Sequence, residues 1–248
     1  MTAEHGRGGG VLVVGVGGTM RPGSSSLAAL RRALGAAAAA GARTELLDLR
    51  HLRLPVYEPD IPLREYGANV WRFVDAVRAA DALIVSTAAY HGTVAGVTKN
   101  ALDFSEFLAD GDPPYLDGKA VGLIATAAGG QAAPNAIAAL VQTAHALRAV
   151  IAPFSVPIPQ AGRLTDDDGD IADAASGRRL DNLGRMVVDL ARKLRGPDVT
   201  VEALAVGISG NAGLPLSPGS RGMDVAFPGP GLVQNGWVSP DSGSSASQ

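Results

Sequence analysis

Two patterns of hydrophobic positions alternate along the chain. One is a short, mostly apolar run, typical of a strand whose two faces are both covered by helices. These runs occupy residues 11–16, 44–49, 82–88, 120–126 and 150–156. The other pattern places apolar residues three or four positions apart, which predicts amphipathic helices. The predicted apolar faces contain Leu27, Leu30 and Leu34; Val70, Phe73, Val74 and Val77; Val97, Ala101, Phe104 and Leu108; Ile137, Leu140, Val141, Ala144 and Leu147; and Leu180, Leu183, Val187, Leu190 and Leu194.

This alternation of five strands with five helices predicts an α/β fold, a doubly wound parallel sheet between two helical layers. Ligands of such sheets bind beyond the carboxyl ends of the strands. The loops after the first, third and fourth strands are therefore expected to meet at one edge of the sheet.

The turn after the first strand has the composition of an anion site. Gly15, Gly17 and Gly18 allow the backbone to turn tightly, and a serine from residues 24–26 can cap the helix that follows. The unpaired N–H groups of that helix then point into the loop, which predicts an anion at this position.

Several hydroxyls and one guanidinium near this turn favour a terminal phosphate. Thr19, Arg21 and the serines at 24–26 offer convergent donors, which suit the charge and free oxygens of a phosphate monoester. The dinucleotide fingerprint would need a third glycine at Met20, and the lysine of a P-loop is absent. FMN therefore fits better than NAD or ATP. Asp48, at the end of the second apolar run, keeps a dinucleotide open, because an acid there can hold a ribose hydroxyl.

Composition and charge exclude several classes of protein. With 248 residues, 46% of them hydrophobic, the chain can bury a sizeable core. A formal charge of -3 and 4% aromatic residues argue against nucleic-acid binding. The absence of cysteine excludes thiolate chemistry, and four scattered histidines do not have the spacing of a zinc site, so no metal is expected. The acidic residues between 164 and 173 indicate a surface turn, because Leu164 stands where a calcium loop needs an acid.

The two ends of the chain differ from its middle. Residues 1–10 lack the apolar core of a signal peptide, and no run approaches the roughly 20 apolar residues of a membrane span, so a cytoplasmic protein is expected. From residue 207 the chain is rich in Gly, Pro and Ser without periodicity. We therefore divide it into a flexible N-terminus (1–10), one folded domain (11–195) and a Gly/Pro/Ser-rich C-terminal extension (196–248). The part from residue 207 is expected to be dispensable for FMN binding.

The loops after the third and fourth strands consist mainly of small residues. Residues 87–93 read TAAYHGT and residues 126–131 read TAAGGQ. Small residues let a flat ring lie against backbone N–H groups, while Tyr90 or His91 lines its edge. A phosphate in the first loop and a planar ring across the other two are consistent with one FMN molecule.

With these loops, the chain resembles the flavodoxin-like NAD(P)H-dependent FMN reductases, a family that includes quinone, azo-dye and chromate reductases and arsenical-resistance flavoproteins. The family's phosphate loop, Gly-Ser-x-Arg-x-x-Ser-x-Ser or Asn, matches residues 18–26 with threonine for the first serine. A second motif runs Pro-x-Tyr-Asn-Gly and then Gly-x-x-Lys-Asn-x-x-Asp-Trp. It is matched at Tyr90, Gly92, Gly96, Lys99, Asn100 and Asp103, with Ala88, His91 and Phe104 replacing proline, asparagine and tryptophan. The similarity covers residues 11–194.

The resemblance implies a flavodoxin-like five-stranded sheet that binds FMN, with NADPH or NADH as co-substrate. Hydride passes from nicotinamide to flavin N5, which requires no catalytic side chain. The residues carried over as binding residues are Thr19, Arg21, Ser24 and Ser26 for the phosphate, and Ala88, Tyr90, His91, Gly92, Gly129 and Gly130 around the ring.

The resemblance also implies a homodimer or a dimer of dimers, with contacts through Phe104, Phe107 or Leu108 on a helix at 96–108. The reduced flavin would then supply a partner monooxygenase or another acceptor. A reductase that retains FMN and reduces quinones or azo compounds is one alternative. A non-enzymatic electron carrier like flavodoxin is another, although such carriers are usually smaller and strongly acidic.

Overall fold

The computed structural model describes residues 10–166 and 168–195. The predicted C-terminal extension, and the predicted N-terminal segment apart from Gly10, lie outside the described residues. The helices and strands, in chain order, are β1 Leu12–Gly17, α1 Ser25–Ala39, β2 Arg43–Asp48, α2 Leu49–Leu52, α3 Ala68–Ala79, β3 Ala82–Tyr90, β4 Thr93–Val94, α4 Gly96–Asp103, β5 Ala120–Thr126, α5 Ala132–Ala146, β6 Val150–Ile151, β7 Val156–Ile158 and α6 Ala174–Arg195. Short 3₁₀ helices span Leu63–Glu65, Phe104–Leu108 and Ala161–Arg163.

The sheet has the strand order β2-β1-β3-β5-β6, and all neighbours in this order are parallel. The order reverses at β1, because the chain moves outward to β2 and then returns past β1 to β3. The predicted doubly wound parallel sheet is confirmed. Reversal places the carboxyl ends of β1 and β3 side by side, with β5 next to them, so the three predicted loops leave the same edge.

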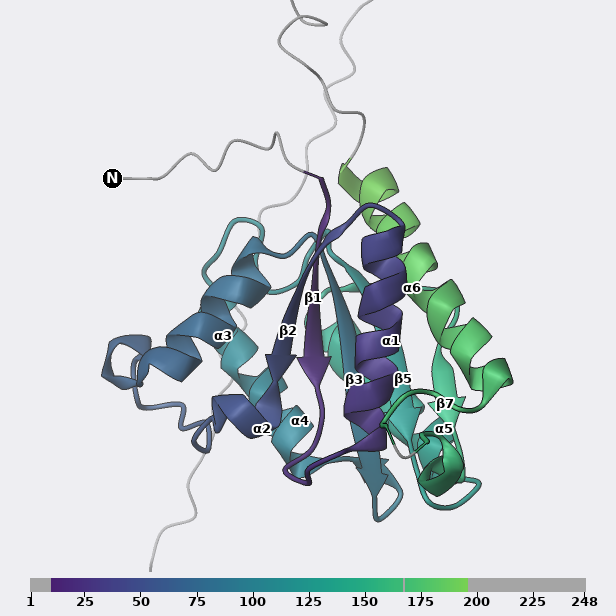
Figure 1. Cartoon of the computed structure of the whole chain (residues 1–248). Coiled ribbons are helices and arrows are strands. Elements are labelled where there is room, and N and C mark those ends of the chain that lie inside the picture. Colours follow the sequence, from purple (N-terminus) through teal and green to yellow (C-terminus); the bar gives the residue numbers. More distant parts are fainter. Residues whose placement is uncertain (1–9, 167, 196–248) are drawn as a thin grey trace, which may run out of the picture. The chain divides into compact units, whose positions relative to one another are not determined.

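Each face of the sheet is covered by its own layer of helices. Val13 and Ile84 pack with α1 and α6, which lie side by side in Figure 1. Val14 and Val85 point to the other face and pack with α3, the segment after α4, and α5. Alternate residues of each central strand thus enter opposite cores, which is why these strands are apolar without alternation.

The segment predicted as the loop after the third strand begins as a hairpin. β3 runs two residues beyond its predicted end, and its last residues pair with β4 in antiparallel register, Ala89 with Val94 and Tyr90 with Thr93. The connecting pair, His91 and Gly92, both have positive φ, 51° and 83°. Positive φ at both central residues is what a two-residue hairpin turn of type I′ requires. This turn explains the glycine at position 92.

The predicted fifth strand is divided in two. β6 pairs with β5 at Ala120 and Val121, and β7 pairs with β5 again further along, at residues 124–126. Between them the chain leaves the ladder at Pro153, which has no N–H to donate. The prediction of one continuous strand at 150–156 is therefore wrong, although both pieces pair in parallel with β5.

Two predicted helices also differ in detail. The helix predicted over 96–108 is α-helical to Asp103 and continues as a 3₁₀ helix to Leu108. Phe104 and Leu108 are buried in the subunit's own core, so they are not available for the predicted contact with a second subunit. In α6, Leu194 is 39% exposed because the last turn of this helix extends beyond α1 (Figure 1).

A bidentate ion pair joins α1 to α6, and its removal tests the packing of this layer. Arg32 Nε and Nη2 each lie 2.6 Å from a carboxylate oxygen of Asp181. Hydrogen bonding to Arg32 lowers the pKa of Asp181. The pair therefore stabilises the fold above the ordinary aspartate pKa of about 3.9, and this contribution is lost as the pH falls through the lower pKa of the folded state. Asp181→Asn is expected to lower the free energy of unfolding by about 0.2–1 kcal/mol at neutral pH, since the pair is partly exposed.

Urea unfolding of both proteins at neutral pH, and in acid below the native pKa, measures this difference. Asp189→Asn is the matched control, because Asp189 lies on the same helix and pairs only within it, with Arg192 at 3.5 Å. The control is expected to change stability less than Asp181→Asn does. A loss in Asp181→Asn that persists undiminished in acid would contradict the electrostatic explanation.

Candidate functional site

The loops after β1, β3 and β5 enclose one cavity of about 410 Å³ at the carboxyl edge of the sheet. Six of the ten predicted binding residues line it: Thr19, Arg21, Ser24, Ser26, Ala88 and Tyr90. Gly23, Ser25, Ala89 and residues 126–128 contribute the rest of these loops. The structure therefore brings the predicted phosphate loop and the predicted ring loops together, while their role in binding stays a prediction.

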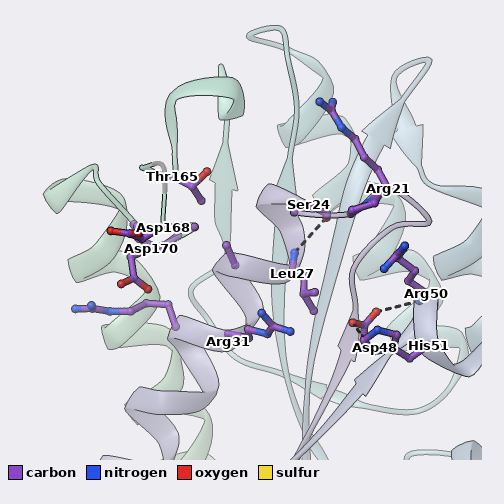
Figure 2. A pocket seen from close by; sticks show the side chains of 16 residues that line it. Arg21, Ser24, Leu27, Arg31, Asp48, Arg50, His51, Thr165, Asp168 and Asp170 are labelled. Atoms are coloured by element: carbon purple, nitrogen blue, oxygen red, sulfur yellow. Dashed lines mark hydrogen bonds and ion pairs between the residues drawn. The ribbon is translucent and has the colours of Figure 1, made fainter.

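The floor of the phosphate loop is the first turn of α1. Ser24 is the N-cap, and its Oγ accepts the Leu27 N–H at 3.3 Å, a bond drawn in Figure 2. The N–H groups of Ser25 and Ser26 lie in the first turn, where a helix has no carbonyl four residues earlier to accept them. They are thus available to a negatively charged group at the helix start.

Buried hydroxyls add further donors beside this turn. Ser24 Oγ and Ser26 Oγ lie 2.7 Å apart, so one of them donates to the other and the pair keeps one hydroxyl hydrogen to spare. Thr19 Oγ1 accepts the Arg21 N–H at 3.1 Å, and its own hydrogen has no acceptor among the described residues. These three side chains are at most 7% exposed. Buried donors normally find an acceptor, and phosphate oxygens in the cavity would provide it.

The strand-to-helix turn is held in place by close backbone contacts. A Cβ on Gly17 would lie 2.3 Å from the Ser86 carbonyl oxygen, so β1 can lie this close to β3 only with glycine at position 17. Gly18 follows with a φ of 92°, which favours glycine. Ser86 Oγ donates to the Ser26 carbonyl at 2.8 Å and ties the start of α1 to β3. The sequence analysis missed Ser86, although a serine inside an otherwise apolar strand was a visible signal.

The second wall is formed by the end of β3. Ala88 and Ala89 leave space against the backbone, and Tyr90 is 51% exposed. Behind them, Thr87 Oγ1 lies 3.1 Å from Thr98 Oγ1 and accepts the Ala95 N–H at 3.1 Å. These buried bonds fix the hairpin to the start of α4.

Four predicted ring residues lie elsewhere. His91 and Gly92 form the hairpin turn. Gly129 and Gly130 lie in the loop after β5, beyond the part of it that lines the cavity. Their place in the wall is taken by Ala161, Gly162 and Thr165, which the sequence analysis did not select. Ala161 N–H donates to the Ala127 carbonyl at 2.9 Å, and the Ala161 carbonyl accepts from Ser25 Oγ at 2.9 Å. These bonds draw the segment after β7 across the cavity.

The charge of the cavity suits an anion. Its lining contains one guanidinium, from Arg21, and no carboxylate. Among the described residues, the Arg21 side chain makes no hydrogen bond or ion pair, and its backbone N–H bonds only to Thr19. Within 10–166 and 168–195 there is also no group of three or more His, Cys, Asp or Glu side chains placed to hold a metal ion. None of the helices in these ranges is long and apolar enough to cross a membrane.

Comparisons with known proteins agree with this arrangement. Residues 11–163 match the family model for NADPH-dependent FMN reductases. An NAD(P)H-dependent FMN reductase of Pseudomonas aeruginosa is 36% identical over 121 residues, 47% of this chain and 64% of the relative. An NADPH azoreductase of a Bacillus strain is 35% identical over 96 residues, 38% of this chain and 48% of the relative.

The fold is shared with a flavoenzyme NAD(P)H:(acceptor) oxidoreductase of Paracoccus denitrificans, at a TM-score of 0.58 and 24% identity, covering 74% of this chain and 98% of that one. The chain spans less than two thirds of the length of either curated relative. The family model, in contrast, runs from β1 through the 3₁₀ helix Ala161–Arg163. It therefore contains every residue that lines the cavity except Thr165. Since the match covers more than half of the sequence, the chain belongs to the NADPH-dependent FMN reductase family.

Proposed function

We propose that the protein is an NAD(P)H-dependent FMN reductase. The observation that carries this proposal is the single cavity in which donors at the start of α1 face the small residues at the ends of β3 and β5. A ligand that fills it needs an anionic group at one end and a flat, largely apolar body at the other. FMN has both, and the membership of the chain in the FMN reductase family supports this choice.

The donors at the start of α1 would hold the phosphate. The spare hydrogens of Thr19 and of the Ser24–Ser26 pair, together with the N–H groups of the first turn, suit a terminal phosphate. The guanidinium of Arg21 has no partner among the described residues, so it can turn to the same group without breaking an existing ion pair. The helix start and one arginine together balance the phosphate charge.

The rest of the cavity would position the ring. Ala88, Ala89 and Ala127 present backbone with little side chain, so a planar group can approach it closely. Tyr90 stands at the exposed rim, where a second ring can stack. A bound flavin supplies hydride chemistry at N5, and the protein's part is to orient the two rings. No side chain is assigned an acid, base or nucleophilic role.

Two kinds of electron acceptor are consistent with this proposal. A reductase that releases reduced flavin would supply a partner monooxygenase, whereas one that retains FMN would reduce a bound acceptor. The similarity to an NADPH azoreductase supports the second, FMN-retaining candidate. The choice between NADPH and NADH, and a homodimeric or tetrameric state, stay predictions.

Oxidation of the nicotinamide is expected to depend on flavin. Protein freed of FMN should oxidise NADPH and NADH slowly, and added FMN should restore rapid oxidation, measured by the loss of nicotinamide absorbance. Flavin absorbance that persists through gel filtration, together with bleaching of an azo dye, would identify the retaining reductase. Bound FMN without nicotinamide oxidation would indicate an electron carrier instead. A colourless protein indifferent to FMN would refute the proposed function.

A further inference from the structure

A second hollow, of about 480 Å³, adjoins the first and has no role in the function proposed above. We call it the α1 groove, because its floor is the exposed side of the first turns of α1, at Leu27, Ala28 and Arg31. One wall comes from the end of β2 and from α2, at Asp48, Arg50 and His51, and the other from residues 168–171. The groove and the first cavity share Arg21, Gly23, Ser24 and Thr165. The phosphate loop is therefore a wall common to both.

Two guanidinium groups of the groove, Arg31 on its floor and Arg50 on its β2 side, make no hydrogen bond or ion pair with the described residues. Arg32 differs, because Asp181 holds it at 2.6 Å. In Figure 2, the Arg31 side chain extends from α1 toward Asp48 and Arg50, while Asp168 and Asp170 lie on the opposite side of the groove. The groove thus has a cationic side that can receive phosphate.

Asp48 is placed to hold a hydroxyl beside these cations. Its side chain caps α2, with Oδ1 accepting the Arg50 N–H at 3.0 Å and Oδ2 lying 3.2 Å from His51 Nδ1. It is 7% exposed and lines the groove, so its carboxylate is fixed at the wall. A carboxylate in such a position accepts hydrogen bonds from ribose hydroxyls. Cations that can bind phosphate and an acid that can bind a ribose hydroxyl therefore line the same groove.

A ligand phosphate held at the common wall need not be terminal. One of its oxygens can carry a further group into the α1 groove while the ring half remains in the first cavity. We propose that the α1 groove binds the adenosine phosphate half of a dinucleotide, with Arg31 and Arg50 on the phosphate and Asp48 on the ribose. This inference rests on the proposed function, because it takes the ring half to lie in the first cavity.

Two dinucleotides share this chemistry, and two experimental arms separate them. FAD carries the flavin itself, so its own phosphate would lie at the common wall. NADPH or NADH would instead stack its nicotinamide on bound FMN, leave the common wall to the FMN phosphate and place only its adenosine half in the groove. In the first arm, FAD and FMN are titrated against wild type, Arg31→Ala and Arg50→Ala by quenching of flavin fluorescence. In the second arm, KM is measured for NADPH and NADH with saturating FMN. Arg64→Ala serves as the matched control, since Arg64 is exposed and lines neither cavity.

If FAD is the ligand, each variant should raise the dissociation constant of FAD by roughly tenfold, from the loss of one charge-assisted hydrogen bond, and leave that of FMN unchanged. If a nicotinamide dinucleotide is the ligand, the variants should instead raise KM for both NADH and NADPH, whose diphosphate is the same. Asp48 on the ribose should then favour NADH, because its carboxylate repels the further phosphate of NADPH. Both effects should shrink as salt is raised, because the groups are partly exposed. The Arg64→Ala control should behave as wild type in both arms.

ADP provides a probe that does not depend on flavin reduction. Calorimetric titration of flavin-free protein with ADP should show binding that weakens in Arg31→Ala and Arg50→Ala. ADP binding that survives both substitutions, or unchanged FAD affinity together with unchanged KM values, would overturn the inference while leaving FMN reduction intact. Failure of wild type to bind FMN, with ADP still bound in an Arg31-dependent way, would instead count against the proposed function.

Discussion

Replacing Gly184 with alanine is expected to destabilise the protein by about 1–3 kcal/mol, the usual cost of forcing an additional group into a packed contact. Gly184 lies in α6 where this helix crosses α1. A Cβ at this position would lie 2.2 Å from the Ala33 carbonyl oxygen and 3.0 Å from Ala37 N. Both atoms belong to the backbone of α1, so neither can move aside as a flexible side chain would. The two helices would have to separate.

Gly35→Ala is the matched control, because Gly35 is also a helical glycine and an added Cβ there would meet nothing within 4 Å. Helix propensity alone favours alanine over glycine by about 0.5–1 kcal/mol, so this variant should be slightly more stable than wild type. Urea unfolding of the two variants should therefore give changes of opposite sign. Equal stabilisation in both would show that α1 and α6 are not packed as closely as described.

The central part of the fold was predictable because its strands are covered on both faces. β5 begins at Ala120 and ends at Thr126, as predicted, since the apolar run starts after Lys119 and is followed by the small residues of the next loop. The edge at 150–158 was harder. Hydrophobic residues continue there through the bend at Pro153, so periodicity does not reveal that the chain leaves the ladder and rejoins it at Val156. Pairing with β5 decides the boundaries, and this is a tertiary effect.

The conformation of the loop after β1, the predicted phosphate loop, could be anticipated for a different reason. Its residues follow one another along the chain, so the order Gly18, Thr19, Arg21, Ser24 already describes a turn and a helix cap. The ring wall depends on segments far apart in sequence. Ala161 and Thr165 reach the cavity only because β7 pairs with β5 and the Ala127 carbonyl accepts the Ala161 N–H. No local sequence pattern predicts such a contact.

Tyr90 and His91 show the limit of reading a loop from composition. They are adjacent in sequence, yet the hairpin turn separates their surroundings. Tyr90 lies at the end of β3 and lines the cavity, whereas His91 occupies the first turn position with a φ of 51°. The pairing of Tyr90 with Thr93 sets this difference. Only the register of β3 with β4, which the sequence analysis did not predict, distinguishes the two side chains.

Arg21→Ala is expected to raise the dissociation constant of FMN roughly tenfold to a hundredfold. A hydrogen bond to a charged group contributes about 1.5–3 kcal/mol, and each 1.4 kcal/mol corresponds to a factor of about ten in affinity. The substitution should not disturb the fold, because the Arg21 side chain is exposed and makes no hydrogen bond or ion pair with the described residues. The backbone bond from Arg21 N–H to Thr19 Oγ1 remains in the variant.

Riboflavin distinguishes a phosphate contact from general loosening of the site, because it has the ring of FMN without the phosphate. Fluorescence titration of both flavins should show a large loss for FMN and almost none for riboflavin in Arg21→Ala. Arg21→Lys should recover part of the FMN affinity, since lysine restores the charge but not the planar two-point geometry. Arg31→Ala, which removes a neighbouring arginine outside the first cavity, should leave FMN affinity unchanged. Equal weakening of FMN and riboflavin, or undiminished FMN binding, would place the phosphate away from Arg21.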